Sequence, residues 1–218
     1  MIRIAFSLLL TFFTAVMAAA DTFTFEVVGI DCAMCGPPIE KALGAVDGVK
    51  RARVDAKAKT ATVEVAAGFD REKLRVAVSN AGFQAVFPGE TARGIEPLPA
   101  EVVARLDIRT YADGRRVEIP AILAPGKVTI VDFYGDWCGP CRVLEARLQH
   151  LMIGGKPNLA VRRVNIGKWD NDAAKQATAL RAEALPYIRV YDARGKFVVA
   201  VTGGMWDEVL AAIEKAER

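Results

Sequence analysis

Four cysteines of this 218-residue chain form two Cys-x-x-Cys pairs, Cys32/Cys35 and Cys138/Cys141. Thiols two residues apart can hold a soft metal ion or cycle as a disulfide. A purely structural disulfide is less favoured here. Closing a loop of about four residues stabilises a fold by only about 2 kcal/mol, whereas closing a loop of about a hundred residues stabilises it by nearly 5 kcal/mol. Both pairs are therefore predicted to perform chemistry, either redox exchange or metal binding.

The second pair follows Val128–Tyr134, a near-continuous apolar run that is typical of a strand buried on both faces. A helix is predicted to begin at Cys138, with Leu144 and Leu148 on its apolar side. Free backbone N–H groups and the helix dipole favour a thiolate at such a position. Lowering a thiol pKa from about 8.5 to about 7 raises its thiolate fraction at pH 7 from about 3% to about half. This pair is thus placed for redox exchange.

Three segments of the second half closely resemble the thioredoxin family: Val131–Phe133, Trp137–Cys141 and Leu185–Ile188. The resemblance covers about 115 residues and implies a thioredoxin fold with thiol–disulfide oxidoreductase activity. It implies that Cys138 is the nucleophile and Cys141 the resolving thiol.

The same resemblance assigns three supporting residues. Asp132 would be a buried carboxylate that moves a proton on or off Cys141, and its apolar neighbours also favour burial. Pro186 would be a cis-proline that borders the substrate groove, and Trp137 would flank the nucleophile.

The dipeptide between the thiols is Gly139-Pro140, as in the reducing members of this fold. Thioredoxin has a potential near −270 mV, whereas an oxidising relative lies near −120 mV. The chain is therefore predicted to be a reductant. Outside the cytoplasm a reductant needs an electron donor, for which we expect a membrane thiol reductase. The expected client is a disulfide-bearing protein or a metallochaperone.

The first pair lies in a β-to-α loop at the start of a repeating pattern over residues 22–88. Alternating apolar residues predict strands, and the stripes at Ile39/Leu43 and Leu74/Val78 predict two helices. The order is β-α-β-β-α-β, a ferredoxin-like α+β arrangement. We expect this domain at 21–88, a Pro- and Gly-rich linker at 89–100, and an α/β thioredoxin-like domain at 101–218.

The loop sequence Gly29–Cys35 resembles the heavy-metal-associated domains of copper chaperones, metal-pumping ATPases and the periplasmic mercury-binding protein. The resemblance implies that Cys32 and Cys35 bind a soft ion, with copper(I) expected and mercury(II) or zinc(II) as alternatives. Asp31 replaces the usual threonine. It is a candidate third ligand, which would suit zinc, or else only a helix cap. Met34 could donate a thioether, and Phe83 fits simple core packing.

The first twenty residues have the organisation of a cleaved signal peptide: Arg3, an apolar run from Ile4 to Met17, and Ala18–Ala20 before the expected cleavage. An uncleaved membrane anchor is the alternative. A periplasmic protein is predicted. The formal net charge is only +3 and no Lys/Arg block occurs, so no nucleic-acid partner is expected. A monomer is expected.

Further along, a hairpin is predicted over 103–119, turning at Asp113-Gly114. The leading functional hypothesis is a disulfide reductase that keeps metal-binding thiols reduced, in its own first domain or in a client, for metal homeostasis or metal-centre assembly. Two alternatives stay open. One is a metal scavenger or carrier whose thioredoxin domain docks a partner, and the other is a redox relay through both pairs without metal.

Overall fold

The computed structural model describes residues 20–30, 35–92, 94–111 and 114–218. Except for Ala20, the predicted signal peptide lies outside the described residues, so its cleavage stays a prediction. In the described part of the chain, no helix is both long enough and apolar enough to cross a membrane.

The N-terminal domain has the predicted βαββαβ order. Its four-stranded antiparallel sheet has the strand order β2-β3-β1-β4. The elements are β1 (Ala20–Val28), α1 (Gly36–Gly44), β2 (Val49–Asp55), β3 (Thr60–Ala66), α2 (Glu72–Asn80) and β4 (Gln84–Val86). The helix α1 ends at Gly44, and Gly48 takes a positive φ in the turn that follows.

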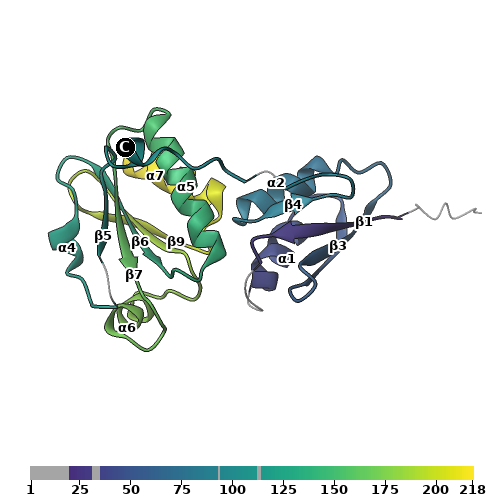
Figure 1. The fold of residues 1–218 in the computed structure, drawn as a ribbon, viewed down its shortest axis with the longest axis horizontal. Helices are drawn as coiled ribbons and strands as arrows, with labels where there is room; N and C mark the ends of the chain where they lie inside the picture. Colours follow the sequence, from purple (N-terminus) through teal and green to yellow (C-terminus); the bar gives the residue numbers. More distant parts are fainter. Residues whose placement is uncertain (1–19, 31–34, 93, 112–113) are drawn as a thin grey trace, which may run out of the picture.

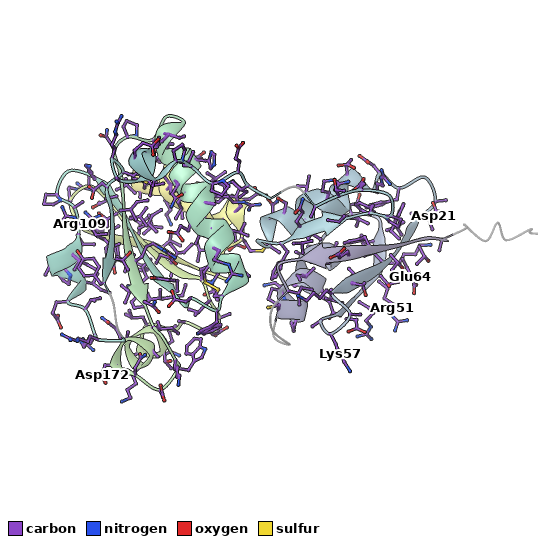
Figure 2. The ribbon with its side chains drawn as sticks, viewed as in Figure 1. Asp21, Arg51, Lys57, Glu64, Arg109 and Asp172 are labelled. Carbon is purple, nitrogen blue, oxygen red and sulfur yellow. A yellow bond between two sulfur atoms is a disulfide. The ribbon has the colours of Figure 1, made fainter. Side chains whose placement is uncertain are left out.

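One face of this sheet forms the core, and the other is solvent-facing. Alternate residues of β1 and β3, such as Val27 and Val63, pack with Leu43 of α1 and Leu74 of α2. The opposite face carries charged side chains, and the strand register places Arg51 opposite Glu64. Figure 2 shows Arg51, Lys57 and Glu64 at the outer side of this domain. The period-two pattern of the strands therefore decides which face the helices cover.

The C-terminal domain is a five-stranded mixed sheet with the order β5-β7-β6-β8-β9. Strands β5, β7 and β6 run parallel, and β8 and β9 extend the sheet antiparallel to β6. The strands are β5 (Ile108–Tyr111), β6 (Val128–Tyr134), β7 (Leu159–Asn165), β8 (Tyr187–Tyr191) and β9 (Phe197–Thr202). The helices are α3 (Ala100–Val103), α4 (Ile119–Ile122), α5 (Gly139–Ile153), α6 (Asp172–Ala179) and α7 (Trp206–Ala216).

Helices cover both faces of this sheet (Figure 1). Leu144 and Leu148 of α5 pack with Val209 and Ile213 of α7 in one core cluster. Ala173 and Ala177 of α6 belong to the cluster on the opposite side. All seven residues of β6 are buried, as the uninterrupted apolar run predicted. The ferredoxin-like domain followed by a thioredoxin-fold domain is thus confirmed.

The predicted hairpin over 103–119 is wrong. Strand β5 pairs in parallel with β7, and residues 115–118 form no strand. Instead Val117 exchanges two hydrogen bonds with the Gln176 side chain of α6. A turn at Asp113-Gly114 favoured a local partner, but β5 instead pairs with the buried strand β7, with Ile108 opposite Val161.

Candidate redox and metal-binding sites

Cys138 and Cys141 are joined in a disulfide at the start of α5. Cys138 is the N-cap residue, and its sulfur accepts a hydrogen bond from the backbone N–H of Cys141 at 3.2 Å. Cys138 is 5% exposed, whereas Cys141 is fully buried. Of the two residues, only Cys138 therefore has exposed surface, and its sulfur lies where helix N–H groups stabilise a thiolate.

The loops next to the disulfide come from distant parts of the chain. Leu185 packs against the cysteines, and its peptide bond with Pro186 is cis, as the resemblance implied. Gly204 lies directly on Pro186: a Cβ at Gly204 would come within 2.6 Å of the proline Cγ. Only glycine allows this approach, so the loop before α7 and the proline form one surface beside the disulfide.

Trp137 is held at the edge of this surface. Its indole N–H donates to the Gly167 carbonyl at 2.7 Å, and its ring covers Gly135, where a Cβ would meet it at 2.8 Å. The side chain is 47% exposed. This combination fixes an apolar ring next to Cys138 while leaving it open to a partner.

Asp132 lies on β6 and is completely buried, as its neighbours predicted. Burial raises the pKa of this carboxyl to about 6, and the nearby Arg163 guanidinium opposes the rise. Within the described structure, its Oδ1 atom has no hydrogen-bond partner, while Oδ2 accepts from Arg163 Nε at 3.5 Å. A carboxyl with a pKa near neutrality can both give and take a proton at physiological pH.

Arg163 is a site residue that the sequence reasoning missed. It lies opposite Asp132 in the β6–β7 register, and its Nη1 atom is 2.7 Å from Glu145 Oε1. Its guanidinium also stacks on the Tyr134 ring, 3.7 Å from the centroid. The signal was present in the sequence: Arg162 and Arg163 interrupt the otherwise apolar run of β7, and a charge is buried only where it is paired.

Replacing Arg163 with leucine is expected to raise the pKa of Asp132 above its value of about 6, because the opposing positive charge is lost while burial remains. A carbon-13 NMR titration of the Asp132 carboxyl measures this value. Arg194→Leu is the matched control, since Arg194 pairs with Asp192 at the surface. An unchanged pKa in Arg163→Leu would show that Arg163 does not tune Asp132.

At the first pair, the structure describes Cys35 but not Asp31, Cys32 or Met34, which lie outside the described residues. Cys35 is the N-cap residue of α1 and is 7% exposed, and Pro37 and Pro38 follow in the first turn. Cys35 is disulfide-bonded in this structure, and in its reduced form a sulfur at this helix N-terminus fits a thiolate ligand for a soft ion. The full ligand set remains a prediction.

Phe83 supports the segment that precedes this pair. It is 4% exposed and belongs to the core, which agrees with simple packing. A Cβ at Gly29 would lie 3.4 Å from its ring, and Gly29 has a φ of +100°. The β1 end therefore lies directly on Phe83 of the α2–β4 turn.

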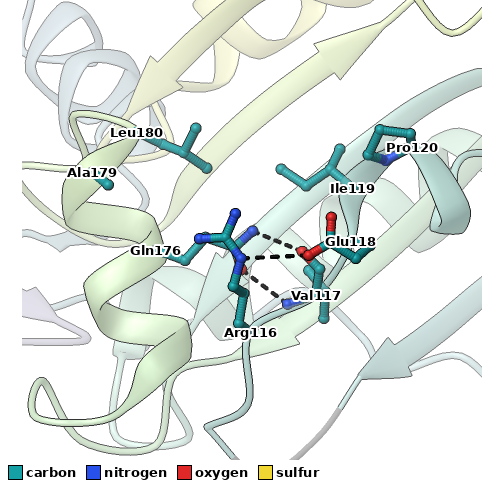
Figure 3. A pocket seen from close by; sticks show the side chains of 8 residues that line it. All are labelled: Arg116, Val117, Glu118, Ile119, Pro120, Gln176, Ala179 and Leu180. Atoms are coloured by element: carbon teal, nitrogen blue, oxygen red, sulfur yellow. Dashed lines mark hydrogen bonds and ion pairs between the residues drawn. The ribbon is translucent and has the colours of Figure 1, made fainter.

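The pockets found lie elsewhere. One of about 250 Å³ separates residues 116–120 from α6 (Figure 3). Its polar groups already have partners: Arg116 pairs with Glu118, and Gln176 bonds Val117. A second pocket is lined by Arg75, Gln84 and Glu90. Neither of these two pockets is lined by a cysteine.

Family models match both domains. The heavy-metal-associated domain model covers residues 24–84, and the thioredoxin model covers residues 120–215. The N-terminal domain belongs to the heavy-metal-associated family, and the C-terminal domain matches the thioredoxin model. The two Cys-x-x-Cys pairs lie one within each matched range.

The heavy-metal-associated domain is similar to the periplasmic component of the mercuric transport protein of Shewanella putrefaciens, with 43% identity over 72 residues, 31% of this chain and 75% of that protein. Oxidized MerP from Ralstonia metallidurans CH34 is a solved structure with 30% identity that covers 32% of this chain and 99% of its own, at a TM-score of 0.31.

The thioredoxin domain is similar to chloroplastic thioredoxin F of Oryza sativa subsp. japonica, with 30% identity over 96 residues, 44% of this chain and 49% of that protein. The chain spans about half or less of the length of the first curated thioredoxin relatives that it matches, down to 29% for thioredoxin-T of Drosophila melanogaster.

Proposed function

We propose that this protein is an exported thiol–disulfide reductase coupled to a soft-metal-binding domain. It keeps metal-binding thiols reduced, either on its own heavy-metal-associated domain or on a metallochaperone client. The observation that carries the redox part is the placement of Cys138 at the start of α5, with Cys141 buried behind it and the carboxyl of Asp132 on the underlying strand.

The proposed reaction moves two electrons. The Cys138 thiolate attacks a client disulfide and releases one client thiolate, giving a mixed disulfide. Cys141 then loses its proton to Asp132 and attacks Cys138, which releases the second client thiol and forms the Cys138–Cys141 disulfide. A membrane thiol reductase is the proposed donor that returns both cysteines to the thiol form.

Metal binding requires reduced thiols, which links the two domains chemically. Copper(I) is the proposed ion, with mercury(II) and zinc(II) as alternatives, because two thiolates favour soft ions of low coordination number. Asp31 would add a ligand only for zinc. The name of the Shewanella relative places that protein in the periplasm and in mercuric transport. A periplasmic location is proposed for this chain too, through cleavage after Ala20.

The double variant Cys32→Ser/Cys35→Ser is expected to lose stoichiometric copper(I) binding, because both proposed thiolate ligands are removed. An anaerobic titration of the reduced chain against a copper(I) chelator measures it. Cys138→Ser/Cys141→Ser is the matched control and should retain binding. If the first variant binds like wild type and the second does not, the metal site has been assigned to the wrong domain.

The alternative is a metal carrier whose thioredoxin domain serves only to dock a partner. The direct contact between the two domains, in which Asn80 bonds Asp207, is the observation that favours it. An insulin-reduction assay with dithiothreitol distinguishes the two functions. Catalysis above the dithiothreitol background supports the reductase, and metal binding without catalysis supports the carrier.

A further inference from the structure

The two domains touch through the end of α2. The Asn80 side-chain amide donates to Asp207 Oδ2 of α7 at 2.5 Å. Arg147 Nη2 of α5 donates to the Ser79 hydroxyl at 2.7 Å. Figure 1 shows α2 next to α5 and α7, and α2 contacts α7 directly. Each pair joins a side chain of one domain to a side chain of the other.

Apolar contacts accompany these bonds. Gly82 lies against Pro140, because a Cβ at Gly82 would be 3.3 Å from the proline Cβ. Met205 packs against the core cluster of the N-terminal domain. Pro140 stands between the two cysteines of the disulfide, and Met205 follows Gly204, which packs on Pro186. The contact therefore borders the redox disulfide on two sides.

Arg147 is held in position on the C-terminal domain's side of this contact. Its guanidinium stacks over the Trp206 ring at 5.5 Å, and its Nη1 atom is buried without a hydrogen-bond partner within the described structure. Burial lowers the pKa of this guanidinium. An arginine held in this way presents its remaining N–H groups toward the neighbouring domain, where Ser79 accepts.

We propose that Pro140, Arg147, Met205 and Asp207, here called the docking face, recognise the α2 end of a heavy-metal-associated domain. The chain's own N-terminal domain is the resident occupant of this face. A separate protein must displace it to reach Cys138, whereas a small disulfide need not. This inference rests on the proposed reductase function and names the partner class of that site.

The strength of the contact fits a displaceable occupant. A hydrogen bond changes an affinity by about two- to tenfold, so two such bonds with a small apolar contact bind weakly. The short linker raises the local concentration of the N-terminal domain to about the millimolar range. Weak contacts at that concentration keep the domain docked for much of the time, yet allow a client to compete.

The variant Asn80→Asp tests the proposal, because it sets a carboxylate against Asp207 without changing the size of the side chain. We expect the rate of insulin reduction to rise about three- to tenfold, since the docking face is freed. Reduction of oxidised glutathione by the reduced chain should stay within about twofold of wild type. Adding Asp207→Asn restores an amide–carboxylate pair in reverse and should return insulin reduction to the wild-type rate.

Asn158→Asp is the matched control, because Asn158 is exposed in the loop between α5 and β7 and is not one of the residues that form the contact. It should leave both rates unchanged. If Asn80→Asp reduces insulin at the wild-type rate while glutathione reduction is normal, the docking proposal is overturned and the reductase function stands. If Asp207→Asn fails to restore the wild-type rate, a specific Asn80–Asp207 contact is excluded. If wild type reduces neither substrate, the proposed function fails, and the docking proposal with it.

Discussion

Replacing Cys138 with serine is expected to lower the rate of insulin reduction by at least about a thousandfold, to the dithiothreitol background. The hydroxyl of serine is a far weaker nucleophile than a thiolate and cannot form the mixed disulfide. Cys138 is the only residue of its pair with exposed surface, so Cys141 cannot take over the attack. Insulin turbidity, with the variant and wild type at equal concentration, measures the loss.

Cys141→Ser is the informative companion to this variant. Attack by Cys138 remains, but no second thiol resolves the intermediate, so a mixed disulfide with the client should accumulate. Non-reducing electrophoresis and mass spectrometry detect it. Should Cys138→Ser trap the client instead, with Cys141→Ser inactive, the roles of the two cysteines would be reversed from those assigned.

Asp132→Asn is expected to slow reduction at pH 7 by about a hundredfold, because proton transfer by a positioned carboxyl typically contributes at least that much. The wild-type rate should change with pH around 6, where Asp132 titrates, and this inflection should be absent in the variant. Rates of client reduction measured from pH 5 to pH 8 test both statements. A variant that keeps the inflection would show that another group is responsible.

The same variant should be more stable than wild type at high pH. The folded-state pKa of Asp132 is raised above its ordinary 3.8, so the folded protein binds the proton more tightly than the unfolded chain. The contribution of Asp132 to the free energy of unfolding is therefore fully present below pH 4. It is lost as the pH rises through about 6, by about 3 kcal/mol in total. Asparagine carries no such charge, and Arg163 still pairs with Glu145 in the variant.

Urea unfolding of wild type and Asp132→Asn at pH 4 and pH 8 measures this effect. The free energy of unfolding of the variant, relative to wild type, should be higher at pH 8 than at pH 4. Asp172→Asn, at the exposed start of α6, is the control for removing a carboxylate without burial. A stability difference that is independent of pH would mean that Asp132 is not a buried, titrating acid.

Much of this molecule could be predicted because its signals are local. The apolar run of β6, the stripes of α1 and α2 and the alternating residues of β1 and β3 each report burial through a period set by backbone geometry. Cys138 could likewise be placed at a helix start, since strand, turn and helix are adjacent in the sequence. The strand pairing of residues 103–119 could not be predicted, because the neighbour of a strand can be any of several strands that lie far away in the sequence.

By itself, the sequence determined the two domains, the two cysteine pairs and the burial of Asp132, since residue types and spacing encode these features. Only the tertiary structure placed Arg163 against Asp132, Gly204 against Pro186 and α2 against the face around Pro140. Each of these contacts joins residues far apart in the chain. Such contacts depend on shape and charge complementarity in three dimensions, for which a single sequence carries no periodic signal.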